Sequence, residues 1–418
     1  MSRGLKILKE QGLKSFLKYR GKKFKNSFAA NLDKHFGKFY PKLPQNYNFI
    51  LFAYGVSGHL ALLNFLKLCG LNEICAIRSG TIMSYSEIKN KLINSTGKNF
   101  LTIAFYRPTK KFKLANLFYD VPIIITLRDP ISRLKSAVNH GWLSYNNFTG
   151  EVEFDLKTNP NEALGTVSYD TETKELATTP QISCTKKIVN ELIDFKYASN
   201  LTPFLIEGGG GNSRQVIYID VEDLKADKAF DTMQKLSKIL HFNPPKEEDR
   251  AKFECKAWDN YRIFLPFIVF IDHKDFPQLK EKITIVVTKE QELQADLKDA
   301  RNLFLNENDL CYKHIWIGIE QKHYELIKKD EDIKERLKSY FKEFVKALDE
   351  KASFRKQHAL NENDVLEYFK NNAALALKLK ALLDRELAHI KQTRPNIIEK
   401  WKYYAEFEKI CEEFARIV

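Results

Sequence analysis

The chain has 418 residues, 44% of them hydrophobic and 12% aromatic, which is enough to form the cores of two or three globular domains. Its six cysteines form no C-x-x-C pair and no cluster with histidine, so they argue against a zinc site and a disulfide scaffold and favour a reducing, cytoplasmic setting. The longest apolar run, "IFLPFIVFI" at 263–271, is about half the length of a bilayer span, and the first residues lack the pattern of a secretory signal. We therefore expect neither secretion by that route nor a membrane-spanning helix.

The positive charge is concentrated near the N-terminus. The formal net charge is +13, and residues 1–47 hold twelve Lys or Arg residues against two acidic residues, a local net charge of +10. Leu5, Leu8, Phe16 and Tyr19 fall near one helical face among the lysines, a pattern typical of a helix that lies on anionic lipid. A basic helix packed on its own protein fits equally well. Nucleic-acid binding is not favoured, because no aromatic-rich basic platform accompanies the charge.

From residue 48 the sequence alternates between strand and helix patterns. Apolar runs predict buried strands at 48–54, 100–106, 121–128 and 215–220, and a helical pattern follows the first of them at 59–70. Strands separated by helices pair in parallel through right-handed crossovers, and ligands bind at the carboxyl ends of such strands. The pattern therefore predicts an α/β fold with a central parallel sheet.

The periodicity weakens between residues 141 and 213, where turn-forming residues predict an excursion over the active face. Its last part, "GGGGNSR" at 208–214, fits a flexible hairpin better than a phosphate loop, because it precedes a strand instead of following one. Two more strands are expected at 264–272 and 283–288, and a helical C-terminal region from about residue 289.

One short motif is repeated in the C-terminal part of the chain. "LNEND" occurs at 305–309 and again at 360–364. Asn306 and Asn361 suit the N-cap position, and the acidic residues after them suit the first turn of a helix, so the motif predicts two helix starts. Metal binding by the acidic residues is the alternative, which we favour less because capping explains every residue.

The stretch "LRDPISRLKS" at 127–136 follows the predicted strand at 121–128 and carries a candidate anion site. Asp129 suits an N-cap, so a helix should begin directly after it, with Ser132, Ser136 and His140 on one stripe of that helix. Arg128 at the strand's carboxyl end and Ser136 would offer a planar guanidinium and a hydroxyl to one anion. The alternative is a salt bridge from Arg128 to Asp129 or to a loop carboxylate, with the serines on a half-exposed helix.

A second candidate lies at "YGVSG", residues 54–58, between the first predicted strand and its helix. A glycine-bracketed turn from strand to helix presents backbone N–H groups and the positive end of the helix to an anion. Gly55 and Gly58 permit close approach, with Ser57 between them. The turn does not have the Walker A sequence, and small strand-to-helix turns are common.

Together these stretches resemble sulfotransferases that use 3′-phosphoadenosine 5′-phosphosulfate (PAPS), especially the carbohydrate-modifying type. "LRDPISRLKS" is similar to the family's 3′-phosphate motif, "YGVSGHLALLNFL" to its 5′-phosphosulfate loop, and 216–245 to its strand, "EDL" turn and helix. The resemblance covers roughly residues 48–250 and implies a P-loop-like three-layer fold. It implies that Arg128 and Ser136 bind the 3′-phosphate and that Gly55, Ser57 and Gly58 bind the phosphosulfate. The chain also resembles members of an uncharacterised bacterial family known only as a domain of unknown function.

Several positions differ from the sulfotransferase pattern. At the end of the predicted strand at 100–106, Tyr106 and Arg107 stand where cytosolic members of the family have a histidine base. Val56 stands where the family has a basic residue before Ser-Gly, and His59 stands where it has Thr or Ser. A cation would then come from elsewhere, and Arg107, Lys110 and Lys111 are the nearest candidates in sequence.

Sulfuryl transfer needs a base near the acceptor hydroxyl but no metal ion. His140 is our first candidate base, because it lies one helical turn past Ser136 and could titrate near neutral pH. His59 is the second candidate. An ordinary polar role remains open for both histidines.

These observations define the expected organisation and activity. We expect a basic segment at 1–47, a sulfotransferase-like α/β domain at 48–288 and a helical region at 289–418. The expected activity is sulfuryl transfer from PAPS to a hydroxyl of a bacterial surface glycan or its lipid-linked precursor, in the cytoplasm or at the periphery of the inner membrane. The alternatives are a transferase with another nucleotide-activated donor and a non-catalytic scaffold.

Overall fold

The computed structural model describes most of the chain and divides it into two compact units. Unit 1 comprises Met1–Arg133, Ile188–Cys255 and Phe369–Val418, and unit 2 comprises Leu134–Lys187 and Lys256–Tyr368. The described residues are 40–78, 81–82, 85–104, 115–143, 153–173, 175–191, 195–206, 214–254, 259–289 and 297–417. The predictions for the basic segment up to residue 39, for Arg107, Lys110 and Lys111, and for the glycine run at 208–211 lie outside these residues. Each unit is described by itself below.

Unit 1 contains the predicted parallel sheet. Its six strands follow the order β10-β5-β1-β4-β2-β3, and all neighbours are parallel except the short edge strand β3. Taken along the chain, the five parallel strands have the order 2-3-1-4-5, so the first strand lies at the centre. The strands are β1 (Ile50–Ala53), β2 (Asn72–Arg78), β3 (Thr81–Ile82), β4 (Asn99–Ala104), β5 (Ile123–Leu127) and β10 (Val216–Asp220). The predicted α/β class is confirmed.

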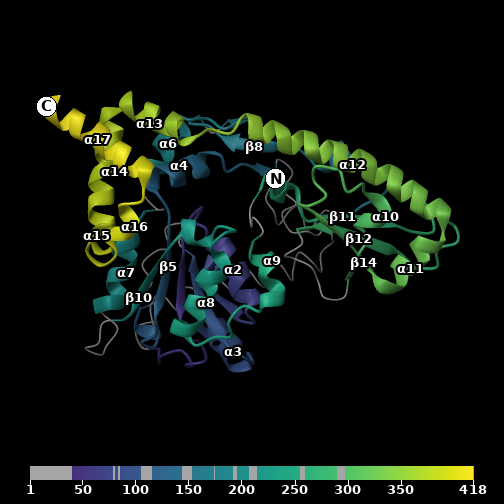
Figure 1. Cartoon of the computed structure of the whole chain (residues 1–418), viewed down its shortest axis with the longest axis horizontal. Coiled ribbons are helices and arrows are strands. Elements are labelled where there is room, and N and C mark those ends of the chain that lie inside the picture. The colour runs from purple at the N-terminus through teal and green to yellow at the C-terminus, as the bar shows by residue number, and fades with distance from the viewer. Residues whose placement is uncertain are drawn as a thin grey trace, which may run out of the picture. The chain divides into compact units, whose positions relative to one another are not determined.

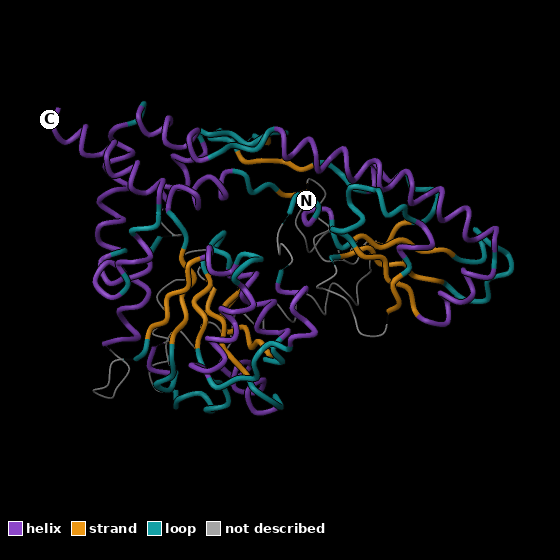
Figure 2. Tube along the Cα trace, viewed as in Figure 1, coloured by secondary structure: helices purple, strands orange, loops and turns teal. Residues whose placement is uncertain are grey.

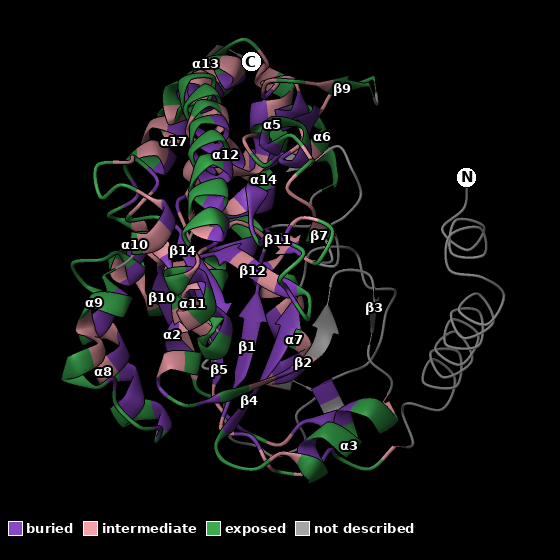
Figure 3. Ribbon diagram, turned by 90° about the vertical axis from the view of Figure 1, so that its right-hand side faces the viewer, coloured by how far each residue is buried: buried purple, intermediate pink, exposed green. Residues whose placement is uncertain are grey.

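Helices cover both faces of this sheet. Alternate residues such as Phe49 and Leu51 share a core with α2 (His59–Leu68), α8 (Ala229–Leu240) and α9 (Arg250–Phe253), and the labelled α2 and α8 lie over the strands in Figure 1. On the opposite face the ring of Phe52 packs against that of Phe204 in α7 (Tyr197–Ile206), with centroids 5.0 Å apart. Because both faces are covered, β1, β4 and β5 are buried along their whole length (Figure 3).

The last helices of the chain belong to unit 1. They are α14 (Ala373–Glu386), α15 (Ala388–Thr393), α16 (Pro395–Ile398) and α17 (Lys402–Ile417). The ring of Phe407 in α17 packs on that of Phe369, with centroids 5.0 Å apart. The predicted helical C-terminal region is therefore confirmed, but these four helices are part of the α/β unit.

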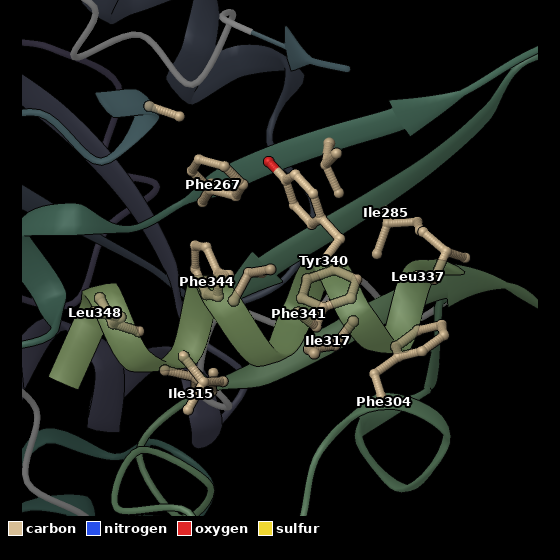
Figure 4. Close-up of a cluster of buried hydrophobic side chains, with 14 of the residues drawn as sticks. Phe267, Ile285, Phe304, Ile315, Ile317, Leu337, Tyr340, Phe341, Phe344 and Leu348 are labelled. Carbon is tan, nitrogen blue, oxygen red and sulfur yellow. The ribbon is translucent and has the colours of Figure 1, made fainter. Parts of the chain in front are cut away.

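Unit 2 is built on a second sheet, drawn in orange with the first in Figure 2. Its order is β13-β14-β12-β11-β7, with bounds β7 (Glu153–Phe154), β11 (Phe267–Ile271), β12 (Ile283–Thr288), β13 (Leu297–Asp299) and β14 (Trp316–Glu320). The long helix α12 (Glu331–Gln357) covers it with an apolar stripe that includes Leu337, Phe341 and Phe344 (Figure 4). Since β12 pairs with β14, the domain boundary predicted after residue 288 falls inside this sheet.

Shorter elements complete the two units. A three-stranded sheet within the predicted excursion contains β6 (Trp142–Leu143), β8 (Val167–Asp170) and β9 (Leu176–Ala177). The remaining helices are α3 (Tyr85–Asn94), α4 (Pro130–Val138), α5 (Pro160–Ala163), α6 (Cys184–Glu191), α10 (Arg301–Phe304), α11 (Gln321–Lys329) and α13 (Glu362–Lys370), with 3-10 turns η2 (Ala115–Leu117), η3 (Val221–Leu224), η4 (Glu247–Asp249) and η5 (Arg262–Phe264). Over the described residues, every helix is too short or too polar to cross a bilayer.

The two "LNEND" motifs adopt different structures. The second begins α13 as predicted: Asn361 Oδ1 accepts from the N–H of Asp364 at 3.2 Å, and Asp364 Oδ2 accepts from the N–H of Asn361 at 2.7 Å. The first forms a turn, in which Asp309 Oδ2 accepts from the N–H of Asn306 at 2.9 Å, and no helix begins within that described stretch. The prediction of a helix start there is wrong, because the motif satisfies its own backbone in either setting.

Candidate functional site

The turn between β1 and α2 has an unusual backbone. Val56 and Gly58 have positive φ angles of 51° and 85°, and Gly58 is the N-cap of α2. A Cβ atom on Gly58 would lie 2.6 Å from Cγ2 of Val221, so both the backbone conformation and the space require glycine at this position. The sequence predicted this turn and its glycines, and the structure explains why Gly58 is there.

The hydroxyl of Ser57 is used inside the protein. Its Oγ donates to the carbonyl of Tyr54 at 2.8 Å and lies 2.8 Å from Oγ1 of Thr126 on β5. Both side chains are buried, so Ser57 ties the turn to the neighbouring strand. The resemblance implied that Ser57 contacts the phosphosulfate, and a contact through its backbone N–H stays a prediction.

The strands β1 and β5 meet where the sheet changes direction. The chain leaves β1 towards β2 on one side and leaves β5 towards β10 on the other, and such switch points are where open α/β sheets bind ligands. Arg128 directly follows β5 and is half-buried, and its Nη1 donates to the carbonyl of Val56 at 3.2 Å. The predicted arginine and the predicted turn therefore lie in contact at this edge.

Arg133, for which the sequence predicted no role, is buried and contacts the same turn. Its side chain is 1% exposed, its Nε donates to the carbonyl of Gly55 at 3.0 Å, and its Nη1 donates to Oη of Tyr197 at 3.0 Å. The guanidinium carbon lies 4.9 Å from the ring centroid of Phe195. The available signal was the second arginine of "LRDPISRLKS", one turn into α4.

The two arginines fix the direction of two peptide groups. In a trans peptide the C=O and the N–H point in opposite directions. The arginines hold the carbonyls of Gly55 and Val56, so the N–H groups of the same two peptides, on Val56 and Ser57, point away from the guanidinium groups. Among the hydrogen bonds of the described residues, none uses the N–H groups of Gly55, Val56 or Gly58. These donors, at the positive end of α2, can bind an anion.

His59, the second candidate base, is the first residue of α2 and is 4% exposed. Burial, opposed by a hydrogen bond to the backbone of Tyr54 and assisted by the charge of Arg133, lowers its pKa to about 4. The ring is therefore neutral at pH 7, has little affinity for a proton and is shielded from solvent. These properties favour a structural role for His59.

The other two predicted residues, Ser136 and His140, lie in unit 2. Ser136 is half-buried in α4, and His140 follows that helix by two residues. Desolvation lowers the pKa of His140 and the charge of Arg355 lowers it further, although the residue is exposed. Because Arg128 belongs to unit 1, its joint action with Ser136 and His140 stays a prediction.

Asp129 is the predicted N-cap of α4 and also joins a second helix. Its Oδ1 accepts from the N–H groups of Ile131 at 2.9 Å and Ser132 at 3.3 Å. Its Oδ2 accepts from the N–H groups of Tyr403 and Tyr404, both at 3.0 Å, at the start of α17. Burial raises the pKa of this carboxyl, and the four N–H donors oppose the rise.

The acidic "DVED" at 220–223 has a structural role. Asp220 Oδ1 accepts from the N–H of Glu222 at 3.0 Å, and Oδ2 accepts from Nε1 of Trp401 at 2.8 Å. The segment therefore forms a capped turn, as the resemblance implied, and not a metal-binding D-x-D. Across the described part of the chain, no group of His, Cys, Asp and Glu side chains is arranged to hold a metal ion.

Comparison with known proteins gives one match. A family model described as "Protein of unknown function (DUF2972)" matches residues 218–414, from within β10 to within α17. No curated protein and no solved structure matches the chain significantly. The matched range includes Asp220 and Trp401 but not the turn at 54–58 or Arg128.

Proposed function

We propose that unit 1 binds the phosphate groups of PAPS, or of its product adenosine 3′,5′-bisphosphate, at the edge formed by β1 and β5. The single observation that carries this proposal is the bond from Arg128 to the Val56 carbonyl, which brings the candidate phosphate arginine to the candidate phosphosulfate turn. Both lie at the switch point of a parallel sheet, where nucleotide phosphates commonly bind.

Each phosphate would have its own donors. The 5′-phosphosulfate would accept from the N–H groups of residues 55–58 and would face the positive end of α2. The 3′-phosphate would accept from the guanidinium of Arg128, whose planar N–H donors suit two oxygens of one phosphate.

The reaction that we propose is sulfuryl transfer. The bond from sulfur to the bridging oxygen of the donor's 5′-phosphate breaks, a bond from sulfur to an acceptor oxygen forms, and the acceptor hydroxyl loses its proton to a base. His140 is the base that we propose, because it follows Ser136 by four residues along the chain and a neutral imidazole can accept a proton. The electron pair of the broken bond stays on the phosphate, whose charge the donors of the turn would stabilise.

The acceptor that we propose is a hydroxyl of a bacterial surface glycan or its lipid-linked precursor. The support is the resemblance to carbohydrate sulfotransferases together with the net charge of +10 in residues 1–47, which would attract an anionic membrane. Liposome flotation of the full chain and of a chain lacking residues 1–47 tests the membrane contact. Equal flotation of both chains would remove that part of the proposal.

A thermal-shift titration with adenosine 3′,5′-bisphosphate tests the nucleotide site. We expect this ligand to stabilise the wild-type protein and Arg416→Ala, an exposed arginine of α17, but not Arg128→Ala. A shift that persists in Arg128→Ala would contradict the assignment of the site. A shift with a nucleotide sugar alone would indicate another donor, and no shift with either ligand would indicate a scaffold protein. Release of adenosine 3′,5′-bisphosphate from PAPS in the presence of acceptor glycan then measures turnover.

A further inference from the structure

The sequence leaves the β1–α2 turn without the basic side chain that the sulfotransferase pattern has before Ser-Gly. Val56 occupies that position, and its carbonyl is held by Arg128. The turn itself, residues 54–58, then offers backbone N–H donors to a phosphosulfate but no positively charged side chain of its own.

Arg133 supplies such a charge on the inner side of the turn. We propose that Arg133 is a positioning residue of the anion site, which fixes the Gly55–Val56 peptide and places a permanent buried positive charge behind it. This inference rests on the proposed function, because it concerns the anion that the same turn would bind.

The surroundings of Arg133 hold its guanidinium in a fixed position. Arginine stays protonated even when buried, and the hydrogen bonds to Gly55 and Tyr197 offset part of its lost hydration. Its guanidinium carbon also lies 5.7 Å from the ring centroid of Tyr54, 4.9 Å from that of Phe195 and 5.7 Å from that of Tyr197. Apolar residues of similar volume often stabilise a folded protein as well as a buried charge does. Stability alone therefore does not explain a buried arginine at this position, and a role in binding is favoured.

The charge and the hydrogen bond act on the anion in the same direction. The bond from Nε polarises the Gly55 carbonyl, and this strengthens the N–H of Val56 at the other end of the peptide as a donor. In a site with little water, the charge itself acts over a longer range than it would in solvent. Its effect reaches the start of α2, where it contributes to the lowered pKa of His59.

A second set of contacts holds the partner of Arg133 in place. Tyr197 begins α7, and Glu386 Oε2 accepts from the N–H of Ser199 in the first turn of that helix at 2.8 Å. Glu386 Oε1 also accepts from the hydroxyl of Ser199 at 2.5 Å, and the carboxylate is fully buried. The hydroxyl of Tyr197, which accepts the hydrogen bond from Nη1 of Arg133, therefore lies on a helix whose first turn is bound to α14.

Calorimetric titrations of full-length protein with two ligands separate this role from a general loss of structure. Adenosine 3′,5′-bisphosphate has the 5′-phosphate that would bind at the turn, and adenosine 3′-monophosphate lacks it. We expect Arg133→Met to weaken binding of the bisphosphate about tenfold, the effect of one charge-assisted hydrogen bond, and to change binding of the monophosphate less than about twofold. Arg133→Lys keeps the charge without the planar guanidinium, so its affinity for the bisphosphate should lie between those of the wild type and Arg133→Met. Arg416→Met, an exposed arginine of the same unit, should match the wild type with both ligands.

Each other outcome decides the inference. Equal weakening of both ligands by Arg133→Met would show a merely structural role and overturn it, and so would unchanged binding of both. If the wild type binds inorganic pyrophosphate but not the bisphosphate, the proposed function fails, and the effect of Arg133→Met on pyrophosphate decides the inference. If the wild type binds neither, both proposals are overturned. Should Arg133→Met not fold, Tyr197→Phe removes only the hydroxyl, and a loss of about threefold confined to the bisphosphate is expected; wild-type affinity there would overturn the inference.

Discussion

The indole Nε1 of Trp401 donates a hydrogen bond to Oδ2 of Asp220 at 2.8 Å, and both side chains are buried. Asp220 is the last residue of β10, and Trp401 directly precedes α17. The neighbouring Asp129, at the end of β5, receives the backbone N–H groups at the start of the same helix. The C-terminal helices therefore complete the carboxyl edge of the sheet on which the candidate site lies.

Trp401→Phe should destabilise the protein by about 3 kcal/mol, because it removes a side-chain donor to a buried carboxylate oxygen and part of a large buried ring. Urea unfolding followed by circular dichroism measures the change. Lys400→Ala, an exposed neighbour, is the matched control and should stay within about 0.5 kcal/mol of the wild type. A Trp401→Phe protein as stable as Lys400→Ala would show that this bond contributes nothing.

His59 predicts a loss of stability on mild acidification. Its pKa is about 4 in the folded protein and about 6.5 when unfolded, so below pH 6.5 the unfolded chain binds a proton that the folded protein does not. The contribution of His59 to the free energy of unfolding is complete above pH 6.5 and is lost as the pH falls towards 4. It amounts to about 3 kcal/mol at 1.36 kcal/mol per pKa unit. Urea unfolding at several pH values between 7 and 4 measures this slope.

The same pH series on two variants tests the assignment. His59→Asn removes the titrating ring and should flatten the stability profile between pH 6.5 and 4. His273→Gln removes an exposed histidine and should leave the wild-type profile unchanged. An unaltered slope in His59→Asn would show that another group causes the pH dependence.

Gly58→Ala should destabilise the protein more than the same change at another glycine with positive φ. Gly70 has a φ angle of 79° with open space around it, so Gly70→Ala should cost only the backbone strain, about 1–2 kcal/mol. Gly58→Ala adds a contact of 2.6 Å with Val221, and a total of about 3 kcal/mol is expected. Thermal unfolding of both variants measures the difference. Val221→Ala in the Gly58→Ala background should recover part of the loss, and no recovery would exclude the contact as its cause.

The sequence was sufficient to predict the parallel sheet because its buried strands are continuous apolar runs, such as the one that became β5. The strand β2 was missed because its sequence, "NEICAIR", contains charged and polar residues near the edge of the sheet. The division into units was not predictable from local patterns, since unit 1 combines three separate segments through long-range contacts. A helix such as α17 shows the same apolar periodicity whichever unit it packs against.

The candidate site was predicted in part for similar reasons. Turn chemistry and strand ends indicated Gly55, Gly58 and Arg128, and the structure brings Arg128 to the turn. Arg133 was missed because an arginine on a helix is usually exposed, and its burial depends on aromatic residues more than 60 positions away. Whether His140 acts as a base depends on groups that no local pattern specifies.

The hydroxyl of Tyr340 lies within the apolar core of unit 2 (Figure 4). Among the described residues its Oη has no hydrogen-bond partner, and burial raises its pKa. Because a buried hydroxyl without a partner has lost its hydration, Tyr340→Phe should leave stability unchanged or raise it by up to about 1 kcal/mol. Phe344→Ala in the same cluster should instead lose about 3–5 kcal/mol through the cavity that it leaves. Thermal unfolding of both variants provides the comparison, and a loss above about 1 kcal/mol in Tyr340→Phe would mean that the hydroxyl is bonded in solution.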